Sequence, residues 1–246
     1  MTSRVLRAII AFAAIGAGAA ALAQEARTPF PPAVSVDDVE RHRLTISPPE
    51  RVGPGQYRIG EIQLNKSERS VSFPATVNMN KGLLEYLLVG KSGKLHESLL
   101  RTSIEPYNLQ LACLLVGIEG TEAPLAFQGD PATPKGDAVE IRLLAKDNDG
   151  KQLAVAPETW LTQMVGETKR DVSGLRWVFS GSVVHNGRFA AQVGGSIIAL
   201  YHDPAAMIDN ASPGVRATRY GLSKRGRHHL SVRLSPSPSR LASNTG

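Results

Sequence analysis

The chain has 246 residues, of which 42% are hydrophobic and 20% are charged, so it can bury one sizeable core or two small ones. Its formal charge is +6, but residues 211–246 hold seven Lys or Arg and no Asp or Glu, and residues 1–23 hold two Arg, which leaves residues 24–210 at −3. The single cysteine, Cys113, excludes an internal disulfide and argues against a cysteine-ligated iron–sulfur cluster, which needs about four ligands.

The first 23 residues are typical of a secretory signal peptide. Arg4 and Arg7 precede the apolar run 8–22, and Ala21-Leu22-Ala23 is a small-x-small cleavage pattern. The run is shorter than the ~20 apolar residues of a membrane span. We therefore expect export to the periplasm or the cell exterior, with no transmembrane helix after cleavage; an uncleaved N-terminal anchor is the alternative. Nucleic acid is a poor partner for an exported protein.

The next elements predict a linker followed by strands. Residues 24–55 are Pro-rich and charged, as in a disordered linker. Alternation over 56–65 changes parity at Gly60, which predicts a bulge or bend there. Residues 65–69 are turn formers and residues 71–77 alternate strictly. Pro74 in this strand predicts an edge position or a missing donor that points outward. The apolar run 83–89 predicts a central strand.

One helix and several further strands are predicted downstream. Ser103 is a candidate N-cap, Pro106 lies in the first helical turn, and Gly117 ends the helix, which would pack across the sheet. Hairpins are predicted at 147–150 and at Asn186-Gly187, the preferred pair for a type I′ turn. The segments 177–185, 189–193 and 196–201 read as strands. Asp203-Pro204 predicts the start of a short helical turn over 205–209.

Together these elements predict an α+β domain over residues 56–210, with a mostly antiparallel sheet and one main packed helix. The signal peptide (1–23) and linker (24–55) precede it. Residues 211–246 predict a basic, mostly disordered tail in which 230–234 alternates as an edge strand. Such a tail could associate with an anionic surface, although a solvated end accounts for the same composition.

Several stretches resemble the YdjY-like family of bacterial exported proteins. They are LNKSERSVSFPATVNMNKGLLEYLLVGKSGKLHESLLRT (64–102), PYNLQLACLLVGIEG behind it, WVFSGS (177–182) and SIIALYHDPAAMID (196–209). The resemblance covers roughly residues 56–210. It implies no defined activity, because the family lacks one. Some relatives are described as ferredoxin-like or iron–sulfur proteins, a feature that Cys113 alone cannot supply.

The segment GKLHESLL (93–100) is the first candidate for chemistry. It lacks the second histidine of a zinc-protease signature, because Leu100 stands four residues after His96. Ser98 lacks the glycine elbow of a hydrolase nucleophile. On a strand, His96 and Ser98 would share one face and Glu97 the other.

A second polar pair, His202-Asp203, follows another predicted strand. If the two strand ends converge, His96, Glu97, Ser98, His202 and Asp203 could bind a polar ligand, or a divalent metal whose identity the sequence leaves open. Structural roles for both histidines are the alternative. The leading interpretation is an exported, non-enzymatic accessory or binding module of the bacterial envelope, with a protein or polar ligand as partner. The competing one is a metal-dependent hydrolase or redox enzyme that uses His96 and His202.

Overall fold

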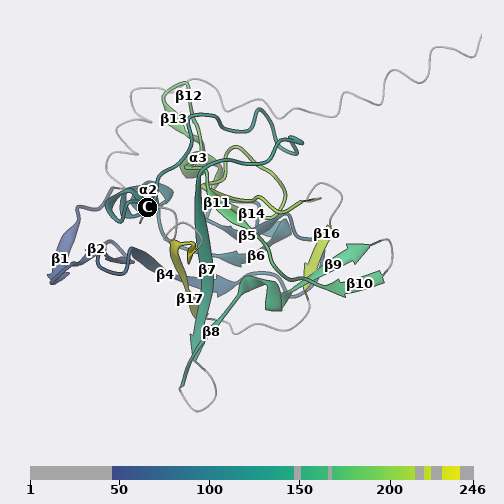
Figure 1. The fold of residues 1–246 in the computed structure, drawn as a ribbon, viewed down its shortest axis with the longest axis horizontal. Coiled ribbons are helices and arrows are strands. Elements are labelled where there is room, and N and C mark those ends of the chain that lie inside the picture. Colours follow the sequence, from purple (N-terminus) through teal and green to yellow (C-terminus); the bar gives the residue numbers. More distant parts are fainter. Residues whose placement is uncertain (1–45, 147–150, 166–167, 214–218, 223–228, 239–246) are drawn as a thin grey trace, which may run out of the picture. The chain divides into compact units, whose positions relative to one another are not determined.

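A computed structural model describes residues 46–146, 151–165, 168–213, 219–222 and 229–238 (Figure 1). The predicted signal peptide and most of the predicted linker, residues 1–45, lie outside the described residues, and so do the turn residues 147–150. No helix within the described segments is long and apolar enough to cross a membrane.

Eight strands close into a mixed β-barrel, because β4 pairs with β6 as well as with β17. In order around the ring they are β4 (Ser70–Val77), β17 (His229–Pro236), β7 (Asp137–Lys146), β11 (Trp177–Phe179), β15 (Ile208–Asn210), β14 (Ser196–Ala199), β5 (Tyr86–Val89) and β6 (Ser98–Arg101). The β14–β15 and β5–β6 pairs are parallel. A barrel of this size has an interior that side chains just fill. Phe73, Leu143, Phe179 and Val232 are accordingly buried.

The expected α+β class is therefore wrong: the protein is mainly β. Turn signals in the sequence predict hairpin pairings between strands that are neighbours along the chain. The β4–β6 pairing and the two parallel pairings join strands that are not hairpin partners, so no turn signal announces them. Closure removes the sheet edges that an open sheet would leave exposed. The main helix is a single element packed outside the ring.

The remaining elements extend or cover the barrel. The strands are β1 (Glu50–Gly53), β2 (Gln56–Ile59) and β3 (Ile62–Asn65), which continue the sheet from β4; β8 (Gln152–Val155) beside β7; β9 (Leu161–Val165), β10 (Thr168–Asp171) and β16 (Arg219–Leu222) in a second sheet; and the pair β12 (Val184–His185) and β13 (Arg188–Phe189). The helices are α2 (Pro106–Leu115), α3 (Ala190–Gly194) and the 3₁₀ turns η1 (Leu95–Glu97) and η2 (Pro157–Trp160). Strand β1 corrects the prediction that residues up to 55 lack regular structure.

Gly60 lies in a tight turn between β2 and β3 and does not form a bulge within one strand. Its φ is +57°, a value that glycine adopts without strain, and Ile59 pairs with Ile62 across the turn. Both isoleucines are buried, so the turn keeps the apolar residues of the two strands on one face. The change of parity in the sequence is thus explained by a change of strand.

Pro74 occupies a gap in the pairing of β4. Its partner on β17 is Ser231, while on the other side β3 pairs only as far as Ser72 and β6 begins at Thr76. The Pro74 carbonyl accepts the Thr102 hydroxyl at 2.6 Å on the side away from β17. The N and C=O of one strand residue point the same way, so the absent N–H also faces this gap and breaks no ladder bond. The gap is the position from which a pocket opens.

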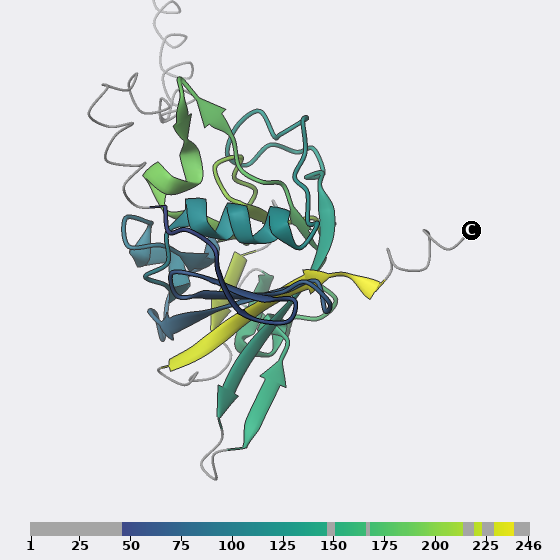
Figure 2. The same ribbon diagram turned by 90° about the vertical axis from the view of Figure 1, so that its left-hand side faces the viewer.

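Helix α2 lies where the sequence predicts a helix, and it packs against β3 and β4 (Figure 2). Its start differs from the prediction, since the Ser103 hydroxyl donates to Glu61 at 2.6 Å and caps nothing. Gly117 ends the helix with a φ of +72°, as predicted. The Arg69 guanidinium donates to the Gly117 carbonyl and so satisfies the helix end from the β3–β4 turn.

Two local predictions near the C-terminal half are corrected. Residues 190–194 form helix α3, where a returning strand was expected. Residues 203–206 form a hydrogen-bonded turn, with the Ala206 N–H donating to the Asp203 carbonyl at 2.9 Å, and β15 follows in place of a helix. The Asn186-Gly187 turn is confirmed, since both residues have positive φ (49° and 74°) between β12 and β13.

The predicted edge strand at 230–234 belongs to β17, which is an internal strand. β17 pairs with β4 on one side and with β7 on the other (Figures 1 and 2). Leu230, Val232 and Leu234 are buried, and the positions between them are half-buried. Part of the basic tail is therefore a wall of the barrel, while segments 214–218, 223–228 and 239–246 lie outside the described residues.

Candidate functional site

The GKLHESLL segment forms a 3₁₀ turn before β6, and so the predicted strand geometry at His96 is wrong. Turn hydrogen bonds from the Gly93 N–H to the Gly90 carbonyl and from the Glu97 N–H to the Lys94 carbonyl hold residues 93–97 in turns, and the strand starts only at Ser98. The His96 side chain is 78% exposed. Ser98 is buried, and its hydroxyl donates to the Leu100 carbonyl at 2.7 Å. The two side chains do not share a face.

Glu97 belongs to a polar cluster at the surface. It lies 3.5 Å from the Lys94 ammonium and 3.7 Å from the His96 ring. Lys94 also donates to Gln128 at 3.2 Å, and Gln128 donates to Glu85 at 3.1 Å. Burial, and then the charge of Glu97, raise the pKa of Glu85. Asp203 adds to this effect, so the two predicted polar corners do lie near one carboxyl group.

Asp203 is buried and structural. It accepts the Tyr86 hydroxyl at 2.7 Å and the Ala205 N–H at 2.9 Å, which fixes the turn after Asp203. Its own N–H donates to the Asp209 carboxylate at 2.9 Å. Burial, with the Asp203 charge as a smaller contribution, raises the pKa of Asp209 to about 7, and burial also raises the pKa of Tyr86.

His202 is buried and contacts two backbone carbonyls. Its ring nitrogens lie 2.8 Å from the Asp130 carbonyl oxygen and 3.0 Å from that of Asn210. Because both ring nitrogens contact backbone carbonyl oxygens, neither nitrogen is available to bind a metal. Within the described residues, no group of three or more His, Cys, Asp or Glu side chains is arranged to hold one. Of the predicted set, the structure brings His96, Glu97 and Asp203 near Glu85, while the His202 ring is engaged by two backbone carbonyls.

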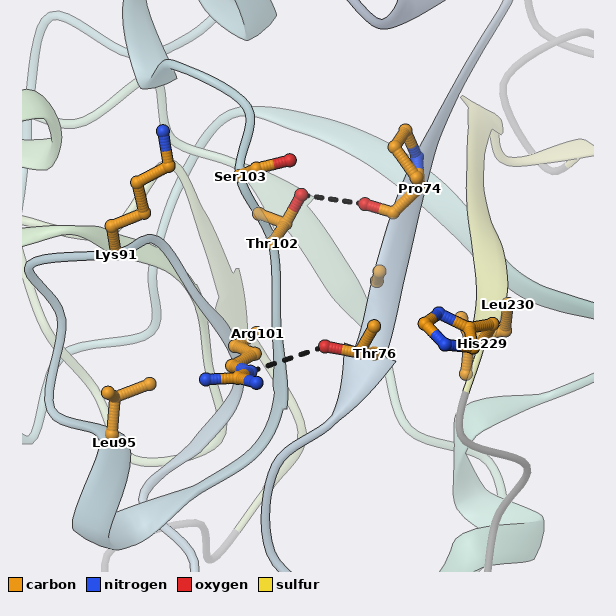
Figure 3. Close-up of a pocket in the computed structure, with 10 residues that line it drawn as sticks. Pro74, Thr76, Lys91, Leu95, Arg101, Thr102, Ser103, His229 and Leu230 are labelled. Atoms are coloured by element: carbon orange, nitrogen blue, oxygen red, sulfur yellow. Dashed lines mark hydrogen bonds between the residues drawn. The ribbon is translucent and has the colours of Figure 1, made fainter.

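A cavity of about 440 Å³ opens instead at the Pro74 gap (Figure 3). We call it the cation-lined pocket, and its lining residues are Pro74, Ala75, Thr76, Lys91, Leu95, Arg101, Thr102, Ser103, His229 and Leu230. Figure 3 shows the loop residues Lys91 and Leu95 on one side and β17 on the other, with Thr76 and Arg101 between them. Leu95 directly precedes His96, so the GKLHESLL segment contributes to this pocket through a different residue from those predicted.

The lining is basic and contains no carboxylate. Arg101 donates to the Thr76 hydroxyl oxygen at 3.3 Å, and no carboxylate of the described residues forms an ion pair with it. Lys91 is 70% exposed and lies 4.0 Å from Glu105. His229 adds an exposed imidazole at the start of β17. The pocket therefore combines fixed positive charge with hydroxyl groups and an apolar wall.

This pocket has almost no local signature in the sequence. Lys91, Arg101 and His229 are far apart in the chain, and the pairing of β4 with both β6 and β17 brings them together. The only local signal was Pro74, whose missing N–H marks the point where the ladder is interrupted. His229 falls in a tail that composition assigns to disorder.

The fold and the site define the protein as a mixed β-barrel with a cation-lined pocket in its wall. A family model described as the YdjY domain matches residues 62–226, more than half of the chain. The chain belongs to the YdjY family, as its sequence predicts. No curated protein and no solved structure matches it.

Proposed function

We propose that the chain is an exported, non-enzymatic accessory module of the bacterial envelope that binds a polar ligand in the cation-lined pocket. The pocket itself is the observation that carries the proposal. Its volume of about 440 Å³ falls among small-molecule sites, which are roughly 300–1,000 Å³, and its lining mixes apolar walls with a few polar groups. The N-terminal signal pattern supports export, although residues 1–23 lie outside the described segments.

The arrangement of reactive side chains favours binding over catalysis. The Ser98 hydroxyl is engaged by a backbone carbonyl, the His202 ring bridges two more, and His96 is exposed beside Glu97. A nucleophile and base must lie within hydrogen-bond reach of each other, and these three residues do not. For the metal-dependent alternative, the part of the chain that the structure describes offers no cluster of three or more His, Cys, Asp or Glu side chains.

One experiment tests export and binding together. The full chain is produced in a bacterial host, recovered from the periplasmic fraction and weighed by intact mass spectrometry. We expect the measured mass to match that of a chain whose first residue is Gln24. A cytoplasmic chain that retains Met1 would contradict the export part of the proposal.

The recovered protein is then screened by thermal shift against small anionic, neutral and cationic aromatic compounds. Ser103→Trp places a large side chain at the rim of the pocket, and Ser67→Trp makes the same change at an exposed serine away from it. We expect at least one compound to raise the melting temperature of the wild type and of Ser67→Trp but not of Ser103→Trp. Absence of any compound with this pattern would remove the pocket as a binding site.

A further inference from the structure

We propose that the ligand of the cation-lined pocket is an organic anion, held by its phosphate, sulfate or carboxylate group on Arg101 and by an apolar body on the wall of the pocket. This inference rests on the proposed function, since it names the class of ligand for the same site. Three features of the pocket support this inference: the hydrogen bonding and ion pairing of Arg101, the position of the nearby carboxylates, and the apolar lining.

Arg101 is the cation best placed to meet an anion. Among the described residues the one hydrogen-bond partner of its side chain is the Thr76 hydroxyl, 3.3 Å from Nε, and no carboxylate of those residues neutralises the guanidinium. The terminal N–H groups remain for a ligand. A guanidinium presents its donors as a planar fork that matches two oxygens of one oxyanion, which gives stronger and more directional binding than an ammonium does.

The neighbouring carboxylates are held at the margin of the pocket. Glu61 accepts the Ser103 hydroxyl at 2.6 Å, and Glu105 accepts Gln192 at 2.6 Å and lies 4.0 Å from Lys91. Neither carboxylate lines the cavity. Glu105 offsets part of the charge of Lys91, so Lys91 should contribute less than Arg101. The Thr102 hydroxyl donates its hydrogen bond to the Pro74 carbonyl and therefore cannot also donate to a ligand.

The apolar part of the lining indicates that the ligand is more than a bare ion. Pro74, Ala75, Leu95 and Leu230 contribute apolar surface, and a cavity of about 440 Å³ exceeds what an inorganic oxyanion would fill. Burial of an apolar body there adds affinity in proportion to the area removed from water. His229 and Leu230 come from β17, beyond residue 226 where the family match ends. Two of the ten lining residues thus lie outside the YdjY domain match, and the match assigns no site to the other eight.

Calorimetric titration of the full chain distinguishes the ligand classes. The probes are phenyl phosphate, phenyl sulfate and benzoate, with benzyl alcohol and benzylamine as uncharged and cationic counterparts and inorganic phosphate as the bare ion. We expect at least one organic anion to bind at least tenfold more tightly than benzyl alcohol, benzylamine and inorganic phosphate. The three organic anions identify which oxyanion is preferred.

Vesicles of phosphatidylglycerol test whether the anion is a lipid headgroup. Vesicle binding that the best organic anion competes away assigns the headgroup as the source, and binding of the soluble anion alone assigns a free compound. Both results support the proposal.

Matched variants locate the contact. Arg101→Gln should weaken binding of the best organic anion about tenfold or more, as expected for a lost charged hydrogen bond. Lys91→Gln should weaken it by only about two- to fivefold, as for an exposed charge. Arg170→Gln, on the exposed strand β10, should leave it unchanged.

Three outcomes overturn the inference. If benzyl alcohol or benzylamine binds as tightly as the organic anions and Ser103→Trp blocks it, the pocket binds ligands but does not select anions, and the proposed function stands without the inference. If Arg170→Gln weakens anion binding as much as Arg101→Gln, the anions associate with the general positive surface. If no compound binds, both proposals fall together.

Discussion

Asp209 is a buried carboxylate of the described core. It is 1% exposed, one carboxylate oxygen accepts the Asp203 N–H, and the other has no hydrogen-bond partner within the described residues. A buried carboxylate with an unpaired oxygen favours the protonated form, which explains why its pKa rises to about 7. The unfolded chain would release this proton at a pKa near 3.9.

The folded state therefore binds one more proton than the unfolded state between about pH 4 and pH 7, and the contribution of Asp209 to stability is lost as pH rises through this window. Asp209→Asn should abolish that loss, which amounts to about 1.4 kcal/mol for each unit between the two pKa values. Urea unfolding at pH 5 and pH 8 measures it. Asp171→Asn, an exposed residue on β10, is the control and should keep the wild-type pH dependence. An unchanged dependence in Asp209→Asn would assign the proton elsewhere.

Single residues were predicted unevenly for physical reasons. The His96 and Asp203 side chains were picked out because their chemical types can react, but burial and hydrogen bonding decide whether a group is offered to a ligand. Asp203 does begin a turn, since a carboxylate that accepts a nearby N–H is a local feature, but the helical turn predicted over 205–209 does not form. The bridging of two carbonyls by His202 depends on contacts with Asp130 and Asn210 that local sequence does not encode.

At the scale of elements, β17 has the greatest consequence for the fold. Val232 pairs with Phe73 on β4 and with Leu143 on β7, and all three side chains are buried. Deletion of residues 229–246 would leave two long strands with unpaired edges and an open core. The strand also carries His229 and Leu230 into the pocket, so folding and binding share this element.

Val232→Asp should therefore unfold the barrel or lower its unfolding free energy by several kcal/mol, because it places an unpaired charge in the core. Ser231→Asp on the same strand, where the side chain is half-buried, should cost much less. Thermal melts followed by circular dichroism compare the two. Similar melting temperatures for both variants would contradict the internal position of β17 and indicate that residues 229–236 form a peripheral strand.

Strands and turns with local signals were predicted well, and their arrangement was not. The Asn186-Gly187 turn, helix α2 and the alternation over 71–77 are each specified within about ten residues. The alternation in HLSVRL likewise indicates a strand but cannot say that its neighbours are residues 71–76 and 139–144. An internal strand and an edge strand differ only in those distant partners.

At the scale of the whole molecule, ring closure explains both the wrong fold class and the missed pocket. Closure requires β4 to exchange its neighbour β3 for β6 along its length, and the gap at Pro74 is the point of exchange. The pocket opens there because the ladder is interrupted, and side chains from three strands and from the connections before and after β6 surround the gap. The composition identifies the tail as basic, but it cannot predict that the fold places His229 in the same pocket as Arg101.

The central claim is that the ligand site lies at this gap and not at the His96 and Asp203 corner. Titration of the ¹⁵N-labelled full chain with the tightest-binding organic anion of the calorimetric series, followed by two-dimensional amide NMR, tests it most directly. We predict that the largest changes in amide chemical shift occur at Thr76, Lys91, Arg101, Thr102 and His229. Changes centred on Glu85, His96, Glu97 and Asp203, with the residues of the pocket unaffected, would contradict it.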